Sequence, residues 1–164
     1  MKSASPHRFH AMASVTSYIK TPIGCLKAVE TQKKLSTLDR VDAPSSLSLN
    51  TPKTDLLCRL ETVLDDYFSG KLKHVPIPLA PTGTPFQKRV WSQLSKVPFG
   101  NTINYTQLAE SIGAPHAVRA VGSALAKNPI LILIPCHRVI LKTGAAGHYK
   151  LGKHCKSFLL SLEQ

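Results

Sequence analysis

The pattern of hydrophobic and polar positions predicts a chain in which short strands come first and helices follow. Residues 17–29 are rich in β-forming side chains and are interrupted by Thr21-Pro22-Ile23-Gly24, which predicts a hairpin. Residues 31–50 are mainly Ser, Thr, Asp and Lys, so an irregular or weakly paired stretch is expected there. Residues 1–14 are expected to be disordered.

A first helix is predicted to begin at Thr51-Pro52 and to end near Gly70, which fits a C-terminal cap. Its apolar residues share one face: Leu57, Leu60, Leu64 and Tyr67. Prolines then predict an extended connector at Pro76, Pro78 and Pro81. We therefore expect a mixed α/β (α+β) protein, with a small β-rich lobe over residues 1–80 and a mainly helical lobe over residues 81–164.

Helical periodicity dominates the second lobe. Thr84-Pro85 marks the start of one helix, and Asn104 marks the start of a second helix that ends at Gly113. A third helix is expected between Ala114-Pro115 and Asn128. A last helix closes the chain, with apolar positions at Cys155, Phe158, Leu159 and Leu162.

The second and third of these helices form a helix-turn-helix pattern. The third is rich in small side chains, which permit close backbone approach to another molecule: Ala117, Ala120, Gly122, Ser123 and Ala124. An ordinary helical hairpin is the commoner explanation of such a pattern. Arg119, which lies beside the inner face, favours a DNA-binding helix.

Residues 130–134 form an unbroken apolar run that is followed by the sequence Pro-Cys-His-Arg-Val. The run predicts a buried strand with Cys136 at its end, and residues 139–141 are expected to continue as a strand. A thiol beside a base or a positive charge can ionise to the thiolate, which is the nucleophilic form. Taken alone, His137 also fits a hydrogen-bonded histidine of the core, and Tyr105 fits a tyrosine that packs a helix end.

Positive charge is concentrated in the half of the chain that holds this cysteine. The 164 residues carry a net charge of +12. Residues 85–164 have ten Lys and Arg against two acidic residues, whereas residues 1–84 have eleven against seven. This distribution fits a nucleic-acid partner, and charge alone fits an ordinary basic domain equally well. Four scattered cysteines, with no signal peptide and no membrane span, indicate a reducing intracellular compartment.

Several motifs between Leu56 and Glu163 together resemble those of the O6-alkylguanine-DNA alkyltransferases, also called methylated-DNA–protein-cysteine methyltransferases. They are residues 66–71 (DYFSGK), 83–87 (GTPFQ), 90–91 (VW), 98–102 (PFGNT), 105–109 (YTQLA), 119–122 (RAVG) and 128–139 (NPILILIPCHRV). The resemblance implies direct-reversal DNA repair. The alkyl group of O6-alkylguanine in a flipped-out base would pass once to Cys136 and inactivate the protein. Activity on O4-alkylthymine stays open.

The resemblance also implies roles for individual residues. Cys136 aligns with the alkyl acceptor, and His137 and Glu163 align with the residues that activate it through a water. Tyr105 aligns with the tyrosine that rotates the 3′ phosphate and hydrogen-bonds the damaged base, and Arg119 with the arginine that fills the vacated stack. The implied DNA contacts are Arg119, Tyr105, Thr106, Ala117, Gly122 and Ser123. The implied substrate pocket comprises Asn128, Pro135, Val139, Gly147, Tyr149 and Lys150, with Asn128 tying the helix-turn-helix to the cysteine segment.

Two departures from the family pattern bear on these expectations. Lys150-Leu151 stands where many members have small residues beside the pocket, which affects the width of the pocket. The residues that hold zinc in the first lobe of some members have no counterpart here, so no metal and no cofactor is expected. The expected partner is double-stranded DNA with alkylated bases, contacted in the minor groove, without a membrane or an obligate protein partner. A monomer is expected, cytoplasmic and nucleoid-associated in a prokaryote or nuclear in a eukaryote.

Two other functions fit part of the sequence. A cysteine hydrolase or acyltransferase using Cys136 and His137 would leave the helix-turn-helix and the charge distribution unexplained. A lesion sensor that binds without transfer would not need Cys136. An alkylated cysteine is a thioether without an activated carbonyl, so each molecule is expected to react once.

Overall fold

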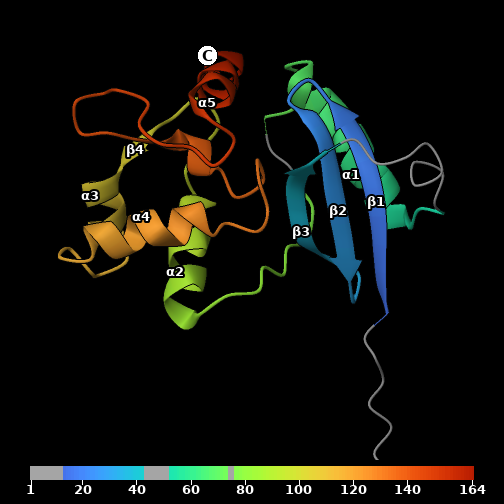
Figure 1. The fold of residues 1–164 in the computed structure, drawn as a ribbon, viewed down its shortest axis with the longest axis horizontal. Coiled ribbons are helices and arrows are strands. Elements are labelled where there is room, and N and C mark those ends of the chain that lie inside the picture. The colour runs from blue at the N-terminus through green and yellow to red at the C-terminus, as the bar shows by residue number, and fades with distance from the viewer. Residues whose placement is uncertain (1–12, 43–51, 74–75) are drawn as a thin grey trace, which may run out of the picture.

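The computed structural model describes residues 13–42, 52–73 and 76–164 (Figure 1). A three-stranded antiparallel sheet and helix α1 lie on one side of the molecule in Figure 1, and helices α2, α3 and α4 lie on the other. The strands are β1 (Ser14–Thr21), β2 (Gly24–Thr31), β3 (Lys34–Val41), β4 (Ile103–Asn104) and β5 (Val139–Ile140). The helices are α1 (Asp55–Phe68), α2 (Pro85–Leu94), α3 (Tyr105–Ser111), α4 (Val118–Ala126) and α5 (Lys153–Leu162). The expected mixed α/β class is confirmed. Disorder was predicted for residues 1–14, of which residues 1–12 lie outside the described residues and Ser14 begins β1.

The N-terminal sheet has β2 between β1 and β3. The predicted hairpin is present, since Thr21 pairs with Gly24 at the end of β1 and β2. The expectation of an irregular stretch after residue 31 is wrong for β3, which pairs with β2 through a turn at Gln32 and Lys33. Both turn residues have positive φ, 52° and 59°, which matches the twist of a two-residue hairpin. The remainder of that stretch, residues 43–50, lies outside the described residues.

The outer edge of β3 is covered by two later segments of the chain, one at Pro78 and one at residues 129–131. The N–H of Leu35 donates to the carbonyl of Pro78 at 2.9 Å, and the N–H of Leu38 donates to that of Pro129 at 2.9 Å. The N–H of Leu131 in turn donates to the carbonyl of Leu38 at 2.8 Å. These bonds satisfy an otherwise open strand edge and fix the segment that leads to Cys136 against the sheet.

Helix α1 begins later than the sequence suggested. Its N-cap is Thr54, whose side chain accepts a hydrogen bond from the N–H of Leu57 at 3.2 Å. The predicted cap at Thr51 lies outside the described residues. The predicted inner face is buried, and Gly70, with φ of 73°, follows the last turn as expected.

The helix-turn-helix pattern corresponds to α3 and α4. The predicted helix starts are present at Thr84 before α2 and at Asn104 before α3, and the structure shows that each is a capping box. After α3, the N–H of Ala114 donates back to the carbonyl of Ala109 at 2.9 Å, which ends the helix in a Schellman-type turn. Helix α4 is shorter at both ends than the segment predicted for it.

The apolar run at residues 130–134 is not a strand. Ile130 makes a single bridge to Leu38 of β3, and the chain then turns, with Ile132 at φ of 70°. Four of these five residues are buried. The run is therefore apolar because it packs in the core, and not because it is a strand of a sheet. Cys136–Arg138 form a short 3-10 turn, η2, and β5 then pairs in parallel with β4.

Three of the four residues in the inner stripe predicted for α5 pack against the core, namely Cys155, Leu159 and Leu162, and Phe158 does not. Phe158 is 43% exposed, whereas Lys156 and Leu159 are fully buried. The ammonium of Lys156 is buried because it donates to two backbone carbonyls, those of Val139 at 2.5 Å and His148 at 3.1 Å. Apolar periodicity cannot reveal a buried charge that has such partners.

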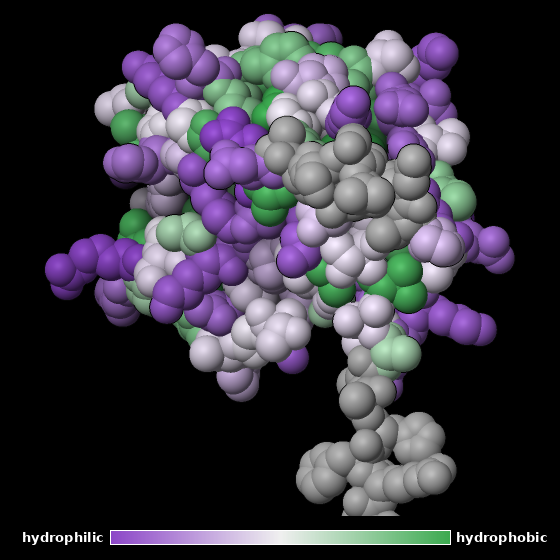
Figure 2. Space-filling view, turned by 45° about the vertical axis from the view of Figure 1, so that its right-hand side comes forward, coloured by the Kyte–Doolittle hydropathy of each residue, from purple (hydrophilic) through white to green (hydrophobic). Residues whose placement is uncertain are grey.

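Hydrophilic side chains project around most of the face shown in Figure 2, with hydrophobic residues in small groups between them. Within the described ranges, no helix combines the length and the apolar character that crossing a membrane requires.

Candidate active site

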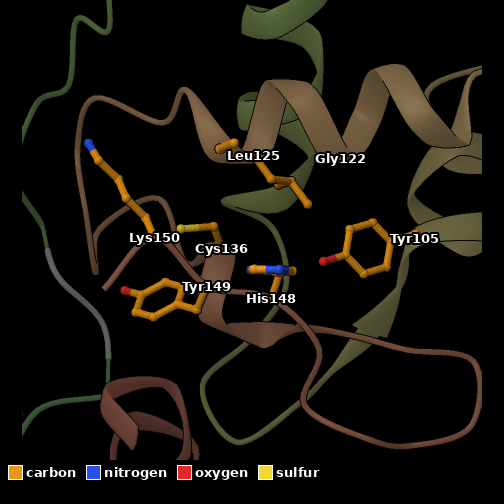
Figure 3. A pocket seen from close by; sticks show the side chains of 8 residues that line it. Tyr105, Gly122, Leu125, Cys136, His148, Tyr149 and Lys150 are labelled. Carbon is orange, nitrogen blue, oxygen red and sulfur yellow. The ribbon is translucent and has the colours of Figure 1, made fainter. Parts of the chain in front are cut away.

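A cavity of about 400 Å³ opens beside Cys136, between α4 and the loop that precedes α5 (Figure 3). Its lining residues are Tyr105, Gly122, Leu125, Ala126, Cys136, His148, Tyr149 and Lys150. Cys136 is only 5% exposed, and its remaining surface faces this cavity. The hydroxyl of Tyr105 points into the cavity from the start of α3. The helix-turn-helix and the cysteine turn therefore share one cavity of a size that suits a small organic group.

Asn128, just after α4, joins the helix-turn-helix to the cysteine turn. Its Nδ2 donates to the carbonyl of Ile134 at 2.8 Å and to Sγ of Cys136 at 3.1 Å. Its Oδ1 accepts from the N–H of Ile130 at 3.0 Å. The amide is fully buried, so it fixes the sulfur relative to α4.

Glu163, the C-cap residue of α5, receives hydrogen bonds from three side chains. Its Oε1 accepts from the hydroxyl of Tyr67 at 2.6 Å and lies 2.7 Å from Nε2 of His137. Arg138 donates to both oxygens, from Nε at 2.7 Å and from Nη2 at 2.9 Å. Burial alone would raise the pKa of Glu163, but the bonds from His137, Arg138 and Tyr67 hold it well below its usual value. The carboxylate is therefore charged.

His137 is completely buried behind the cysteine and does not line the cavity. Burial lowers its pKa and outweighs the opposite effect of Glu163, so the imidazole is neutral at neutral pH. Because Glu163 is charged, the proton of the imidazole lies on Nε2. Nδ1 is then the basic nitrogen, and it has no hydrogen-bond partner among the described residues.

Burial also raises the pKa of the Cys136 thiol, which differs from the simple expectation of an ionised sulfur. Four contributions lower the pKa of the thiol: the hydrogen bond from Asn128, a backbone hydrogen bond of Cys136 itself, and the positive charges of Lys156 and Lys150. The resting sulfur is therefore a thiol in surroundings that stabilise the thiolate once a base removes the proton.

Three residues of this network were not assigned a role from the sequence. Tyr67 and Arg138 donate hydrogen bonds to Glu163, and the charge of Lys156 lowers the pKa of Cys136. Tyr67 and Arg138 lie inside motifs shared with the family. Nothing in their sequence positions indicates that they bind a carboxylate that is 96 residues from Tyr67 and 25 residues from Arg138. Lys156 had a detectable signal, since a lysine three residues before Leu159 shares its helical face.

The implied pocket residues fall into three groups. Tyr149 and Lys150 line the cavity with Cys136, whereas Asn128, Pro135 and Val139 are buried and are not among its lining residues. Gly147 lines an adjoining hollow that also includes Tyr105. The difference arises because the 3-10 turn directs the neighbours of Cys136 into the core instead of along one face of a strand.

The implied DNA contacts lie at the start of α3 and on α4. Arg119 and Ser123 are exposed, while Thr106, Ala117 and Gly122 are half-buried. Gly122 faces Tyr105, because a Cβ added to it would meet the tyrosine ring at 3.8 Å. The exposed face of α4 therefore borders the cavity of Cys136.

This arrangement defines a class of mixed α/β proteins in which a helix-turn-helix borders the cavity of a single buried cysteine. Residues 85–164 match the model of the 6-O-methylguanine DNA methyltransferase, DNA binding domain. The methylated-DNA–protein-cysteine methyltransferase of Methanosarcina barkeri is 43% identical over 152 residues, covering 89% of this chain and 94% of the relative. The constitutive enzyme of that name from Bacillus subtilis is 38% identical over 152 residues, covering 88% and 92%.

Solved structures agree with the sequence comparison. An O6-methylguanine methyltransferase of Mycobacterium tuberculosis superposes with a TM-score of 0.80 at 37% identity, covering 92% of this chain and 93% of that chain. A Mycobacterium tuberculosis OGT in complex with DNA gives 0.81 at 38% identity, covering 90% and 91%. The chain belongs to the methylated-DNA–protein-cysteine methyltransferase family.

Proposed function

We propose that this protein repairs alkylated DNA by transferring the alkyl group from O6 of guanine to Cys136, once per molecule. The observation that carries the proposal is the position of Sγ of Cys136. It faces a cavity beside α4, it accepts a hydrogen bond from Asn128, and its residue directly precedes His137, which pairs with Glu163. Membership of a family whose members carry the methyltransferase name supports the same activity.

Activation of the sulfur begins with the neutral imidazole of His137. The thiol proton passes, through a bridging water, to Nδ1, the free basic nitrogen. The carboxylate of Glu163, 2.7 Å from Nε2, stabilises the resulting imidazolium. General-base assistance of this kind contributes roughly 10²–10⁴-fold in rate.

In the transfer step, the thiolate attacks the alkyl carbon in line with its bond to O6. The S–C bond forms, the C–O bond breaks, and the electron pair leaves on the guanine oxygen. The hydroxyl of Tyr105, which points into the cavity, supplies the proton that this anion needs. The product is a thioether that the site has no means to hydrolyse, so the protein is consumed.

The damaged base must leave the stack to reach a sulfur at the bottom of a cavity. We propose that the exposed face of α4 binds in the minor groove of DNA and that Arg119 fills the space left by the base. The residues placed near the DNA backbone are Thr106, Ala117, Gly122 and Ser123. The surplus of basic residues in residues 85–164 favours phosphate contacts that do not depend on sequence. Extrusion costs a few kcal/mol, which an inserted side chain offsets in part.

We further propose that residues 81–164 carry the chemistry and the DNA contacts, while residues 1–80 support the cysteine segment through β3. The protein would act as a monomer on double-stranded DNA, in the cytoplasm of a prokaryote or the nucleus of a eukaryote. The hydrogen bonds of Leu38 with Pro129 and Leu131 support this division of roles.

The test is mass spectrometry of the protein after incubation with excess duplex DNA that contains O6-methylguanine. We expect one added methyl group per chain, on the peptide that contains Cys136. Cys136→Ser should remain unmodified, and Cys155→Ser should react like the natural chain, because Cys155 does not line the cavity. An unmodified Cys136 after complete incubation would contradict the proposal. Lesion binding without transfer would favour a sensor, and multiple turnover on an activated ester would favour a hydrolase.

A further inference from the structure

Lys150 is the one lysine among the described residues that line the cavity of Cys136. Its Nζ pairs with Oδ2 of Asp39, on β3, at 2.5 Å. Both side chains are about one-third exposed, at 33% and 31%. An ion pair with this much solvent access is weak, so the ammonium can exchange Asp39 for another anion at small cost.

The sulfur of Cys136 points away from Tyr105, toward the side of the cavity where Lys150 and the hydroxyl of Tyr149 lie (Figure 3). Lys150 is close enough to the sulfur to lower the pKa of the thiol. The hydroxyl of Tyr149 is buried and has no hydrogen-bond partner among the described residues. The ammonium of Lys150 and the unpaired hydroxyl of Tyr149 thus lie on the side of the sulfur opposite Tyr105, the proposed proton donor.

An alkyl group must occupy the space beside the sulfur, because the thiolate attacks its first carbon. If that group carries a carboxylate, two negative charges have to approach each other in a largely buried cavity, which slows the reaction. A cation next to both offsets this repulsion, and the free hydroxyl can donate to the carboxylate. A methyl group gains nothing from either contact.

We propose that Lys150 is a specificity-determining residue that adapts this protein to O6-alkyl groups ending in a carboxylate, with Asp39 competing for its ammonium. The inference rests on the proposed transfer to Cys136. Attack on an O6-carboxymethyl group forms the S–C bond, breaks the C–O bond and leaves S-carboxymethylcysteine. The guanine oxygen takes up a proton, as in methyl transfer.

The experiment compares transfer rates from duplexes that contain O6-carboxymethylguanine or its neutral counterpart of similar size, O6-carbamoylmethylguanine. The ratio of the two rates is measured within each variant, so a general loss of folding or of thiol reactivity cancels. Lys150→Met should lower this ratio by about fivefold, which is the upper end expected for a partly exposed charge contact. Lys150→Arg should retain it, and Asp39→Asn should raise it, because the competing anion is lost.

Lys153→Met is the matched control, since Lys153 lines only the adjoining hollow and should leave the ratio unchanged. An unchanged ratio in Lys150→Met would overturn the inference, and so would an equal fall in Lys153→Met. Methyl transfer by the natural chain distinguishes a failure of the specificity role of Lys150 from a failure of the proposed transfer to Cys136. If methyl transfer is present and the ratio does not respond to Lys150, the specificity role fails while the proposed function stands. If the natural chain transfers no methyl group, the proposed function fails.

Discussion

Nε2 of His137 lies 2.7 Å from Oε1 of Glu163, although 26 residues separate them in the chain. The carboxylate belongs to the cap of α5 and the imidazole to the cysteine turn. Arg138 reinforces the connection, since its guanidinium donates to both oxygens of the same carboxylate. A change at the end of α5 is therefore expected to alter the reactivity of Cys136.

Glu163→Gln should slow alkylation of Cys136 and reduce stability. The amide cannot stabilise an imidazolium, so we expect the transfer rate to fall by roughly 10²-fold. It also leaves the charge of Arg138 without its buried partner, which costs about 3 kcal/mol in the free energy of unfolding. Single-turnover transfer rates and urea denaturation measure the two effects.

Tyr67→Phe is the control for Glu163→Gln, because it removes one donor to Oε1 but leaves the charge. We expect a loss of about 1 kcal/mol in the free energy of unfolding and a transfer rate close to that of the natural chain. A loss of transfer as large as that of Glu163→Gln would show that packing, and not the carboxylate charge, is responsible.

Gly100→Ala should damage the same end of α5. Gly100 has φ of 78°, and an added Cβ would lie 2.9 Å from the carbonyl oxygen of Glu163. Gly144 has a similar φ of 86° but nothing within 4 Å of an added Cβ. We expect Gly144→Ala to cost only backbone strain, about 1–2 kcal/mol, with normal transfer. Gly100→Ala should lose more stability and also slow transfer, and equal transfer rates in the two variants would argue against the coupling.

Lys156 should make stability depend on pH. Burial lowers its pKa from 10.5 to about 8, although Cys136 acts in the opposite direction. Between these values the unfolded chain binds more protons than the folded chain, so the contribution of Lys156 to stability rises with pH. Denaturation at about pH 7.5 and about pH 10 should show the natural chain gaining stability relative to Lys156→Met. A constant difference between the two proteins would mean that Lys156 does not titrate in this window.

Arg119→Ala should weaken repair of duplex DNA more than reaction with free O6-methylguanine. Arg119 is exposed on α4 and has no place in the cavity lining, so we expect the substitution to affect extrusion of the base and not the chemical step. Transfer rates on both substrates measure this difference. Equal losses on the two substrates would remove Arg119 from the extrusion step.

Local signals in the sequence were sufficient for much of the fold. The helix starts at Thr84 and Asn104, and the turn between Thr21 and Gly24, were located correctly because each depends on residues close together in the chain. The strand β3 was missed because its two buried leucines, Leu35 and Leu38, are separated by polar residues and depend on pairing with β2. Pairing across a sheet is not encoded within a short window.

The candidate site also combines features that local sequence reveals with features that only the fold reveals. The motif around Cys136 and the resemblance to a known family located the cysteine, His137 and Glu163 within the sequence. The roles of Arg138 and Tyr67 as partners of Glu163 emerged only from the fold, since a buried carboxylate is satisfied by whichever donors packing brings near it. The ion pair of Lys150 with Asp39 joins residues 111 positions apart in the chain, so it too could be found only from the fold.

The sequence by itself indicated the candidate nucleophile, the family and the order of the helices, because nucleophile chemistry, motif spacing and capping are properties of neighbouring residues. Only the tertiary structure decided that the run at residues 130–134 turns instead of extending, that the Cys136 thiol is protonated at rest, and that Lys156 is buried. These features depend on burial and on charges from distant parts of the chain. Their energies exist only after the chain has folded.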